Sequence, residues 1–264
     1  MQPVRIGVAT AGFRQPLKQA VQTAAAIGAR GVQFDVRDEL KPADLSDSGR
    51  RQFLHQLSEM GLQTASLHIP FRRPLLDPDQ MDARLELARS ILQFAYQLRA
   101  NVVTARIGPI PPDPASVEYD TLRQIAQDLA RAGNQLGARL AIVPTGDPPE
   151  RLKQFLDTVV SEGPLGLDFD PAGFVMAGHD PTEALRTLHM HVLHFQARDG
   201  LRELGGGGVE TSIGRGEVDW TEMIALVQEI DYRGWVVVNR TQGDDRLGDL
   251  ARGVEYLRTI TFQD

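Results

Sequence analysis

The sequence contains no cysteine. This absence excludes disulfide bridges, thiolate zinc sites and cysteine nucleophiles, and it fits a reducing compartment. No run approaches the ~18 apolar residues that a membrane helix needs. The opening segment MQPVRIGVATAG has neither the long apolar core nor the small-residue cleavage site of a signal peptide. We therefore expect a cytoplasmic protein with no membrane partner.

Basic charge is also scarce. The chain has 28 Lys and Arg against 35 Asp and Glu, a formal net charge of -7 and a pI near 5.4. A nucleic-acid partner requires a basic face, so we expect none. The length of 264 residues is close to the roughly 250 of a (β/α)8 barrel, which folds as one domain.

Short apolar strands alternate with amphipathic helices along the whole sequence, which predicts a parallel sheet covered by helices. We expect strands at 4–9, 31–36, 63–69, 101–107, 139–143, 166–169, 192–197 and 235–239. We expect helices at 15–27, 46–60, 79–98, 115–135, 149–160, 181–188, 219–230 and 247–260.

This alternation favours a (β/α)8 barrel over an open doubly wound sheet. The first turn, Ala9-Thr10-Ala11-Gly12-Phe13, lacks the glycine-rich phosphate fingerprint that usually marks the open sheet. The proline-rich segment 109–114 cannot be helical and is expected to form a loop above the fourth strand. No linker divides the chain, so residues 1–264 are predicted to form a single barrel domain.

The C-terminal ends of barrel strands carry the active site, so polar residues there are the candidates. Residues two apart point to the same side of a strand, which groups Asp168 with Asp170, and His194 with Gln196 and Arg198. The candidates at strand ends are Ser66, His68, Thr104, Arg106, Asp168, Asp170, His194, Gln196, Arg198, Asp199, Asn239 and Arg240.

Several of these residues also have a structural interpretation. Buried polar residues inside a barrel are hydrogen-bonded whether or not they act in catalysis. Asp199-Gly200 and Pro171 are also turn signals. The segment 205–208 is read as a flexible loop, because it lacks the Lys and Ser/Thr of a phosphate-binding loop.

Two further motifs also have both a functional and a structural interpretation. His189, His191 and His194 have the look of a metal site, but the first two fall at a helix-to-strand junction at the opposite end of the barrel. In the segment 214–220, Asp219 is placed to cap a helix, and Arg215 either contacts an anion or a sugar oxygen or is solvated.

The chain resembles the xylose-isomerase-like barrel family, also called the sugar phosphate isomerase/epimerase family. The resemblance covers nearly the whole chain. Its more specific marks are Gly-x-Gly-x-Val-Asp-Trp and Asp-Pro-x-x-Ala-Leu. The similar segments are IGVATAGF, AAAIGARGVQFD, GLQTASLHIPF, LAIVPTGDPPERLKQFLD, LGLDFDPAGFVMAGHDPTEALRTL, VLHFQARDG and IGRGEVDWTEMIALVQEIDYRGWVVVNR.

The resemblance implies metal-assisted proton transfer beside a sugar carbonyl, with a divalent ion held by Glu, Asp, His and Glu on strands five to eight. In this chain the ligand positions carry Val143, Asp170, Gln196 and Asn239, so Asp170 is the one strong ligand retained. A Glu often found after the second strand becomes Gln33, and a His after Asp170 becomes Gly173.

We therefore expect an isomerase- or epimerase-like protein acting on a small carbohydrate or sugar phosphate, without a tightly bound metal. Weak binding of Mn²⁺ or Mg²⁺ stays open. The predicted catalytic residues are His68, Asp170 and His194. The predicted substrate-binding residues are Arg106, Asp168, Gln196, Arg198, Arg215 and Asn239.

Two alternatives remain. The chain is a catalytically inactive barrel that binds a carbohydrate or a regulatory partner, or it is a metallo-isomerase whose ligands are His68, Asp168, Asp170 and His194. A nuclease is disfavoured by the acidic charge balance.

Overall fold

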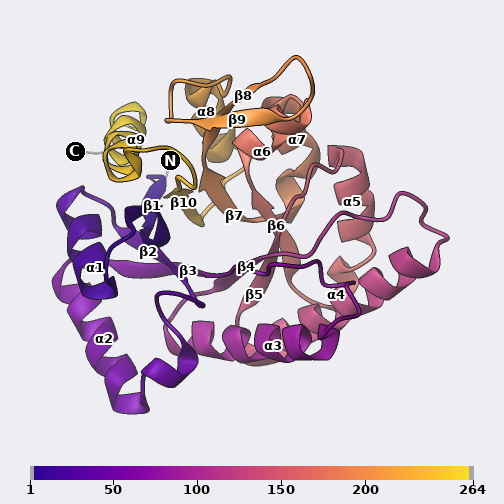
Figure 1. Ribbon diagram of the computed structural model, residues 1–264, viewed down its shortest axis with the longest axis horizontal. Helices are drawn as coiled ribbons and strands as arrows, with labels where there is room; N and C mark the ends of the chain where they lie inside the picture. Colours follow the sequence, from indigo (N-terminus) through magenta and orange to yellow (C-terminus); the bar gives the residue numbers. More distant parts are fainter. Residues whose placement is uncertain (1–2, 262–264) are drawn as a thin grey trace.

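Eight parallel strands close into a barrel in the computed structural model, which describes residues 3–261 (Figure 1). The order around the barrel is β1-β10-β7-β6-β5-β4-β3-β2, so each strand lies beside its neighbour in sequence. The strands are β1 Arg5–Ala9, β2 Gly31–Asp35, β3 Gln63–Ile69, β4 Val102–Arg106, β5 Arg139–Val143, β6 Leu165–Phe169, β7 Val192–Ala197 and β10 Trp235–Val238. The predicted (β/α)8 fold is confirmed.

Helices surround the barrel (Figure 1). They are α1 Leu17–Ala26, α2 Asp47–Glu59, α3 Met81–Gln97, α4 Val117–Leu136, α5 Pro149–Asp157, α6 Pro171–Ala177, α7 Pro181–Leu188, α8 Trp220–Glu229 and α9 Arg246–Ile260. Short 3₁₀ turns span Thr10–Phe13, Pro42–Asp44, Val160–Glu162 and His189–His191. Within the described residues, no helix is both long enough and apolar enough to cross a membrane.

The helix ends follow the signals in the sequence. The Ser46 side chain caps α2 by accepting a hydrogen bond from the Gly49 amide at 3.2 Å. Ser116 caps α4 in the same way, and α4 ends at Gly137, whose φ of 77° is the left-handed conformation that glycine adopts freely. These local signals set the helix lengths and so fix how the loops above the barrel begin.

Two turn interpretations are wrong. Pro171 begins helix α6 rather than a turn, because proline fits the first position of a helix, where no amide bond is lost. Asp199 and Gly200 begin strand β8, Asp199–Arg202, which pairs antiparallel with β9, Gly208–Thr211. The segment 205–208, expected to be a flexible loop, forms the tip of this hairpin and the first residue of β9, and the hairpin packs on α6 (Figure 1).

The carboxylate of Asp199 holds the loop that follows the hairpin. Asp199 is fully buried. It accepts hydrogen bonds at 2.9–3.2 Å from the amides of Gly214, Gly216 and Val218 and from the indole N–H of Trp220. A Cβ on Gly216 would lie 2.1 Å from an Asp199 oxygen, so only glycine fits there.

We expect Asp199→Asn to lower the free energy of unfolding by at least ~3 kcal/mol, because an amide N–H would replace an acceptor oxygen and face buried N–H donors. Urea unfolding followed by circular dichroism measures this. The matched control is Asp219→Ala, which removes the cap of α8 and should cost only ~1 kcal/mol. Equal losses in the two variants would contradict the role given to Asp199.

Candidate functional site

A closed ring of hydrogen bonds fills the inside of the barrel. His194 Nδ1 lies 2.6 Å from Asp168 Oδ1, and His194 Nε2 lies 2.9 Å from Ser66 Oγ. The Gln33 amide donates to Ser66 Oγ at 2.9 Å, and the Gln196 amide donates to Gln33 Oε1 at 3.1 Å and Asp168 Oδ2 at 3.3 Å. All five side chains are buried. The five side chains come from the adjacent strands β2 and β3 and, across the barrel, from the adjacent strands β6 and β7. The ring therefore links opposite sides of the barrel wall.

The ring has a consistent direction of donation. With its proton on Nδ1, His194 donates to Asp168 and accepts from the Ser66 hydroxyl, which in turn accepts from Gln33. The Ser66–His194–Asp168 contacts resemble those of a serine hydrolase, but Ser66 is 0% exposed and therefore out of reach of any substrate. The ring is an internal support rather than a nucleophile.

Further hydrogen bonds connect the ring to the mouth of the barrel, at the C-terminal ends of the strands. The Asn239 amide donates to Gln196 Oε1 at 2.9 Å. Thr104 Oγ1 lies 3.5 Å from the Gln33 amide and 2.8 Å from His68 Nδ1. When Thr104 accepts from Gln33 it can donate to His68 Nδ1, which leaves the proton of neutral His68 on Nε2.

A cavity of about 200 Å³ lies at this mouth. His68 and Asp35 line one side, and Arg240 and Arg246 line the other, with the turn after β1 between them. Burial lowers the pKa of His68, and the charge of nearby Asp35 opposes that shift. His68 is therefore neutral at neutral pH, a state suited to donating a hydrogen bond to a carbonyl oxygen.

Two guanidinium nitrogens at this cavity have no acceptor. Among the described residues, Arg240 Nη1 and Arg246 Nε are buried without a hydrogen-bond partner. The Arg240 guanidinium binds Asp249 through Nε at 2.9 Å, and its Nη1 lies 3.9 Å from Glu210 Oε1, beyond hydrogen-bond distance. Unsatisfied buried donors are costly, so this side of the cavity favours an anionic group.

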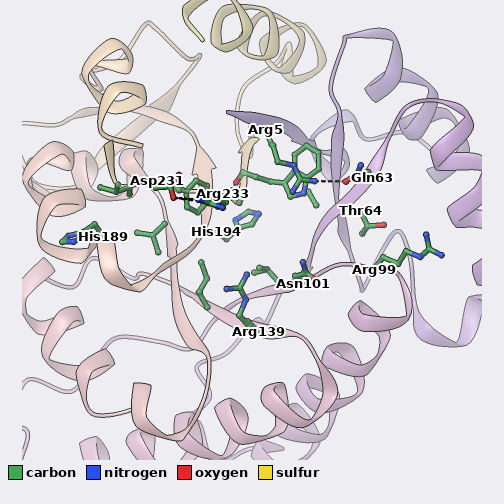
Figure 2. A pocket seen from close by; sticks show the side chains of 18 residues that line it. Arg5, Gln63, Thr64, Arg99, Asn101, Arg139, His189, His194, Asp231 and Arg233 are labelled. Atoms are coloured by element: carbon green, nitrogen blue, oxygen red, sulfur yellow. Dashed lines mark hydrogen bonds and ion pairs between the residues drawn. The ribbon is translucent and has the colours of Figure 1, made fainter. Parts of the chain in front are cut away.

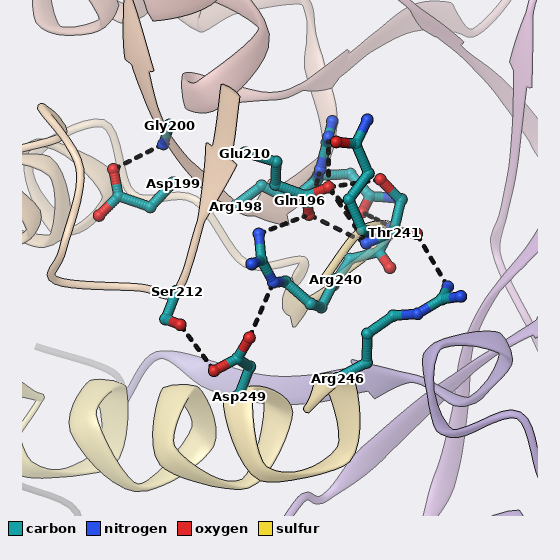
Figure 3. Close-up of polar contacts among 12 residues, drawn as sticks. Gln196, Arg198, Asp199, Gly200, Glu210, Ser212, Arg240, Thr241, Arg246 and Asp249 are labelled. Carbon is teal, nitrogen blue, oxygen red and sulfur yellow. Dashed lines mark hydrogen bonds and ion pairs between the residues drawn. The ribbon is translucent and has the colours of Figure 1, made fainter. Parts of the chain in front are cut away.

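Beside this cavity, charged residues cluster at the lip of the barrel (Figure 3). Arg198 pairs with Asp170 at 2.5 Å and with Glu210 at 3.3 Å. Glu210, from the hairpin, also accepts from the amides of Thr241 and Gln242 at 3.0 and 3.1 Å. Burial acts to lower the pKa of Arg198, but the charges of Asp170 and Glu210 together raise it above its usual value, so its charge is permanent. Burial raises the pKa of Asp170, while the Arg198 charge counteracts it.

The side chains at the lip do not fit a divalent cation. Asp170 keeps one unpartnered oxygen, Oδ1, but its other oxygen binds Arg198. Gln196 Oε1 is occupied by Asn239, and Val143 carries no donor atom. Across residues 3–261 there is no group of three His, Cys, Asp or Glu side chains placed to hold a metal ion. Hard cations require several oxygen ligands, which this set does not supply.

The structure separates the residues that the sequence grouped together. His68 and Asn239 line the mouth cavity, whereas Asp168, His194 and Gln196 belong to the buried ring. Asp170 and Arg198 pair with each other at the lip. Arg106 is exposed, and its charge acts on His68; Arg215 is exposed on the loop around Asp199.

Sequence reasoning missed Asp35, Glu210 and Arg246. Asp35 ends β2 and could have been found, because it lies at the C-terminal end of a predicted strand. Glu210 lies in an unpredicted hairpin and Arg246 begins a helix, so no strand-end rule points to them.

The three clustered histidines do not meet. The His191 ring contacts Asp157 at 2.9 Å, and His189 contacts the Arg186 carbonyl at 2.8 Å, while His194 lies in the ring. The expectation that His189 and His191 lie at a helix-to-strand junction is confirmed.

A family described as "Xylose isomerase-like TIM barrel" matches residues 21–260. Among solved structures, a xylose isomerase domain protein from Planctomyces limnophilus has a TM-score of 0.85 at 22% identity, with 98% of each chain covered. A xylose isomerase-like TIM barrel protein from Mycobacterium smegmatis, in complex with magnesium, has a TM-score of 0.78 at 18% identity, with 99% of this chain and 98% of that chain covered.

D-psicose 3-epimerase from Clostridium cellulolyticum H10, determined with D-tagatose, has a TM-score of 0.75 at 14% identity, with 98% of this chain and 99% of that chain covered. At these identities the similarity concerns the fold. No curated protein matches the sequence significantly.

The carboxyl group of Glu39 contacts residues beside the mouth cavity. Glu39 Oε2 accepts from the Thr10 hydroxyl at 3.0 Å and from the Asp35 amide at 2.8 Å. Burial, and to a smaller extent the charge of Asp35, raise the pKa of Glu39 to about 7. Glu39 therefore binds a proton in the folded protein at pH values where it has lost that proton in the unfolded chain.

The raised pKa of Glu39 should make stability fall as pH rises from about 5 to about 7, because only the unfolded state releases the proton across that range. Glu39→Gln keeps the acceptor oxygen and removes this dependence. We expect it to exceed the wild type in free energy of unfolding by ~2 kcal/mol at pH 8, below the full linkage value because the carboxyl is partly solvated, and by little at pH 5. Urea unfolding at both pH values measures the difference.

Glu86→Gln, on the exposed face of α3, is the control and should show no such pH-dependent gain. A gain for Glu39→Gln that is equal at pH 5 and pH 8 would mean that the carboxyl has an ordinary pKa.

Proposed function

The chain belongs to the Xylose isomerase-like TIM barrel family, and from that premise we propose that it transfers a proton beside the carbonyl of a small sugar bearing an anionic group. The site is the mouth cavity, and the reaction runs without a tightly bound divalent metal. The phosphate of a sugar phosphate or the carboxylate of a sugar acid supplies the anionic group.

The observation that carries this proposal is the pair of buried donors without acceptors, Arg240 Nη1 and Arg246 Nε. A phosphate or carboxylate placed between them would accept from both nitrogens and would supply a counter-charge to Arg246, since Arg240 already pairs with Asp249 at 2.9 Å. A sugar anchored by this group would direct its carbons toward His68 and Asp35, across a cavity of about 200 Å³.

Proton transfer at the other side needs a base and an electrophile. Asp35 Oδ1 accepts from the amides of Arg37 and Asp38 at 2.7 and 3.1 Å, while Oδ2 has no partner among the described residues. In the proposed reaction Asp35 removes the proton next to the carbonyl, and His68 Nε2–H donates to the carbonyl oxygen as the enolate forms. The hydroxyl next to the carbonyl then passes its proton to the enolate oxygen and becomes the new carbonyl, while protonated Asp35 returns its proton to the former carbonyl carbon, which isomerises the sugar.

The arrangement favours isomerisation over epimerisation. Epimerisation needs a second acid on the opposite face of the sugar, whereas the carboxylate and imidazole that line this cavity, Asp35 and His68, both lie on the β2–β3 side. One carboxylate can move a proton between neighbouring carbons on one face. Epimerases among the similar structures nevertheless make sugars the first substrates to test.

A second candidate is a barrel that binds an anionic sugar without turnover. It is favoured by the pairing of Asp170 with Arg198, which takes the one retained ligand of the family out of use. Both candidates keep the predicted carbohydrate ligand, and both keep as predictions a cytoplasmic location and the lack of a nucleic-acid partner.

Deuterium uptake distinguishes the two candidates. We expect hexose 6-phosphates or hexuronates incubated with the protein in D₂O to gain deuterium next to the carbonyl, as followed by proton NMR. His68→Gln should slow this at least 100-fold, within the range for loss of one acid–base group. Arg246→Gln should raise KM about tenfold with little effect on kcat. Arg51→Gln, on the exposed surface of α2, is the control.

Binding of one of these compounds with neither deuterium uptake nor formation of an isomer would support the second candidate and reject the first. Unchanged uptake in His68→Gln would remove His68 from the reaction.

Metal independence has a separate test. We expect elemental mass spectrometry of protein purified without chelator to find no stoichiometric Mn²⁺, Mg²⁺ or Zn²⁺, and EDTA to leave deuterium uptake unchanged, because Arg198 neutralises Asp170. Millimolar Mn²⁺ should leave the melting temperature unchanged. A clear stabilisation by micromolar Mn²⁺ would show that other residues form a metal site.

A further inference from the structure

A second cavity, of about 590 Å³, opens at the opposite end of the barrel, where the strands begin (Figure 2). Its wall includes Arg5 at the start of β1, Arg139 at the start of β5, Arg99 before β4 and Arg233 before β10. Barrel bottoms normally serve stability, and the proposed reaction takes place at the other end. The concentration of arginine here therefore needs its own explanation.

Most of this positive charge has no counter-charge within residues 3–261. Arg233 pairs with Asp231 at 2.6 Å. Arg5 donates to the neutral Gln63 side chain at 2.7 Å and stacks on Trp235, with its guanidinium carbon 3.9 Å from the ring centroid. Among the described residues, the side chains of Arg99 and Arg139 have no hydrogen-bond or ion-pair partner. Three cations thus surround one cavity of a protein whose net charge is -7.

Other features of the wall also fit an anion. Thr64 lines the cavity and is 6% exposed, and its hydroxyl has no partner in the described part of the chain. Burial lowers the pKa of Arg5, Tyr232 opposes that shift, and no carboxylate among the described residues adds to the opposition. A bound anion would supply acceptors for the hydroxyl and for the guanidinium groups.

We propose that this cavity binds a small polyanion carrying two or more phosphate or carboxylate groups, held by Arg5, Arg99 and Arg139. A single phosphate would neutralise only part of the charge, and 590 Å³ is within the size range of small-molecule sites. The site is independent of the proposed sugar site, because the buried ring of hydrogen bonds lies between the two cavities, with His194 forming part of the arginine-lined wall.

Pyrophosphate and citrate are the probes, with inorganic phosphate as the single-group comparison. Trp235 lines the cavity, while Trp220, the other tryptophan, is buried against Asp199, so intrinsic fluorescence reports on this end of the barrel. We expect saturable quenching by pyrophosphate or citrate with a Kd below ~1 mM, and at least tenfold weaker binding of phosphate. Binding of pyrophosphate alone would identify a phosphate site, and binding of citrate alone a carboxylate site.

Arg99→Gln and Arg139→Gln should each weaken binding about tenfold, because each removes one charge-assisted contact. Arg99 is exposed, so its variant tests the site without disturbing the core. Arg51→Gln on α2 and Arg246→Gln at the mouth make the same change of charge elsewhere and should leave the affinity unchanged. Absence of saturation up to ~10 mM, or equal weakening in all four variants, would overturn the proposal.

Failure of this experiment would leave the sugar site unaffected, because deuterium uptake does not depend on the arginine-lined cavity.

Discussion

The carboxyl group of Asp168 is 0% exposed at the centre of the barrel, and the rest of the interior is organised around it. A buried acid without donors would cost several kcal/mol, so His194 and Gln196 must donate to it. Those two residues in turn need Ser66 and Gln33 to complete their own hydrogen bonds. The constraint therefore propagates from one acid to side chains on β2, β3, β6 and β7.

This polar layer also divides the barrel into two chemically distinct ends. At the mouth, His68 and Asp35 face Arg240 and Arg246, an arrangement suited to proton transfer on an anchored anion. At the opposite end, arginines that have no ion-pair partner in residues 3–261 line a larger cavity. At the lip, the Arg198 guanidinium forms an ion pair with Asp170, the one strong metal ligand that the resemblance leaves in this chain.

The fold could be predicted from the sequence because alternation of short strands and helices is a local pattern, and eight repeats close a barrel. The site could be predicted only in part. The place of His68 and Asn239 at the mouth cavity could be predicted because each stands near the C-terminal end of a strand, whereas their roles stay predictions. The pairing of Asp170 with Arg198, and of Glu210 with both arginines at the lip, depends on side-chain distances that no spacing encodes. The β8–β9 hairpin was not predicted, because glycine-rich segments such as 205–208 also form flexible loops.

The segment Gly214–Trp220 is one of the more specific marks of the family resemblance, and several of its residues contact the carboxylate of Asp199. Gly216 leaves room for the carboxylate, and the amides and the indole bind it. The signature is therefore architectural. This chain keeps the signature although three of the four metal-ligand positions that the resemblance implies carry Val143, Gln196 and Asn239. The signature therefore indicates the fold, and the chemistry of the pocket has to be determined residue by residue.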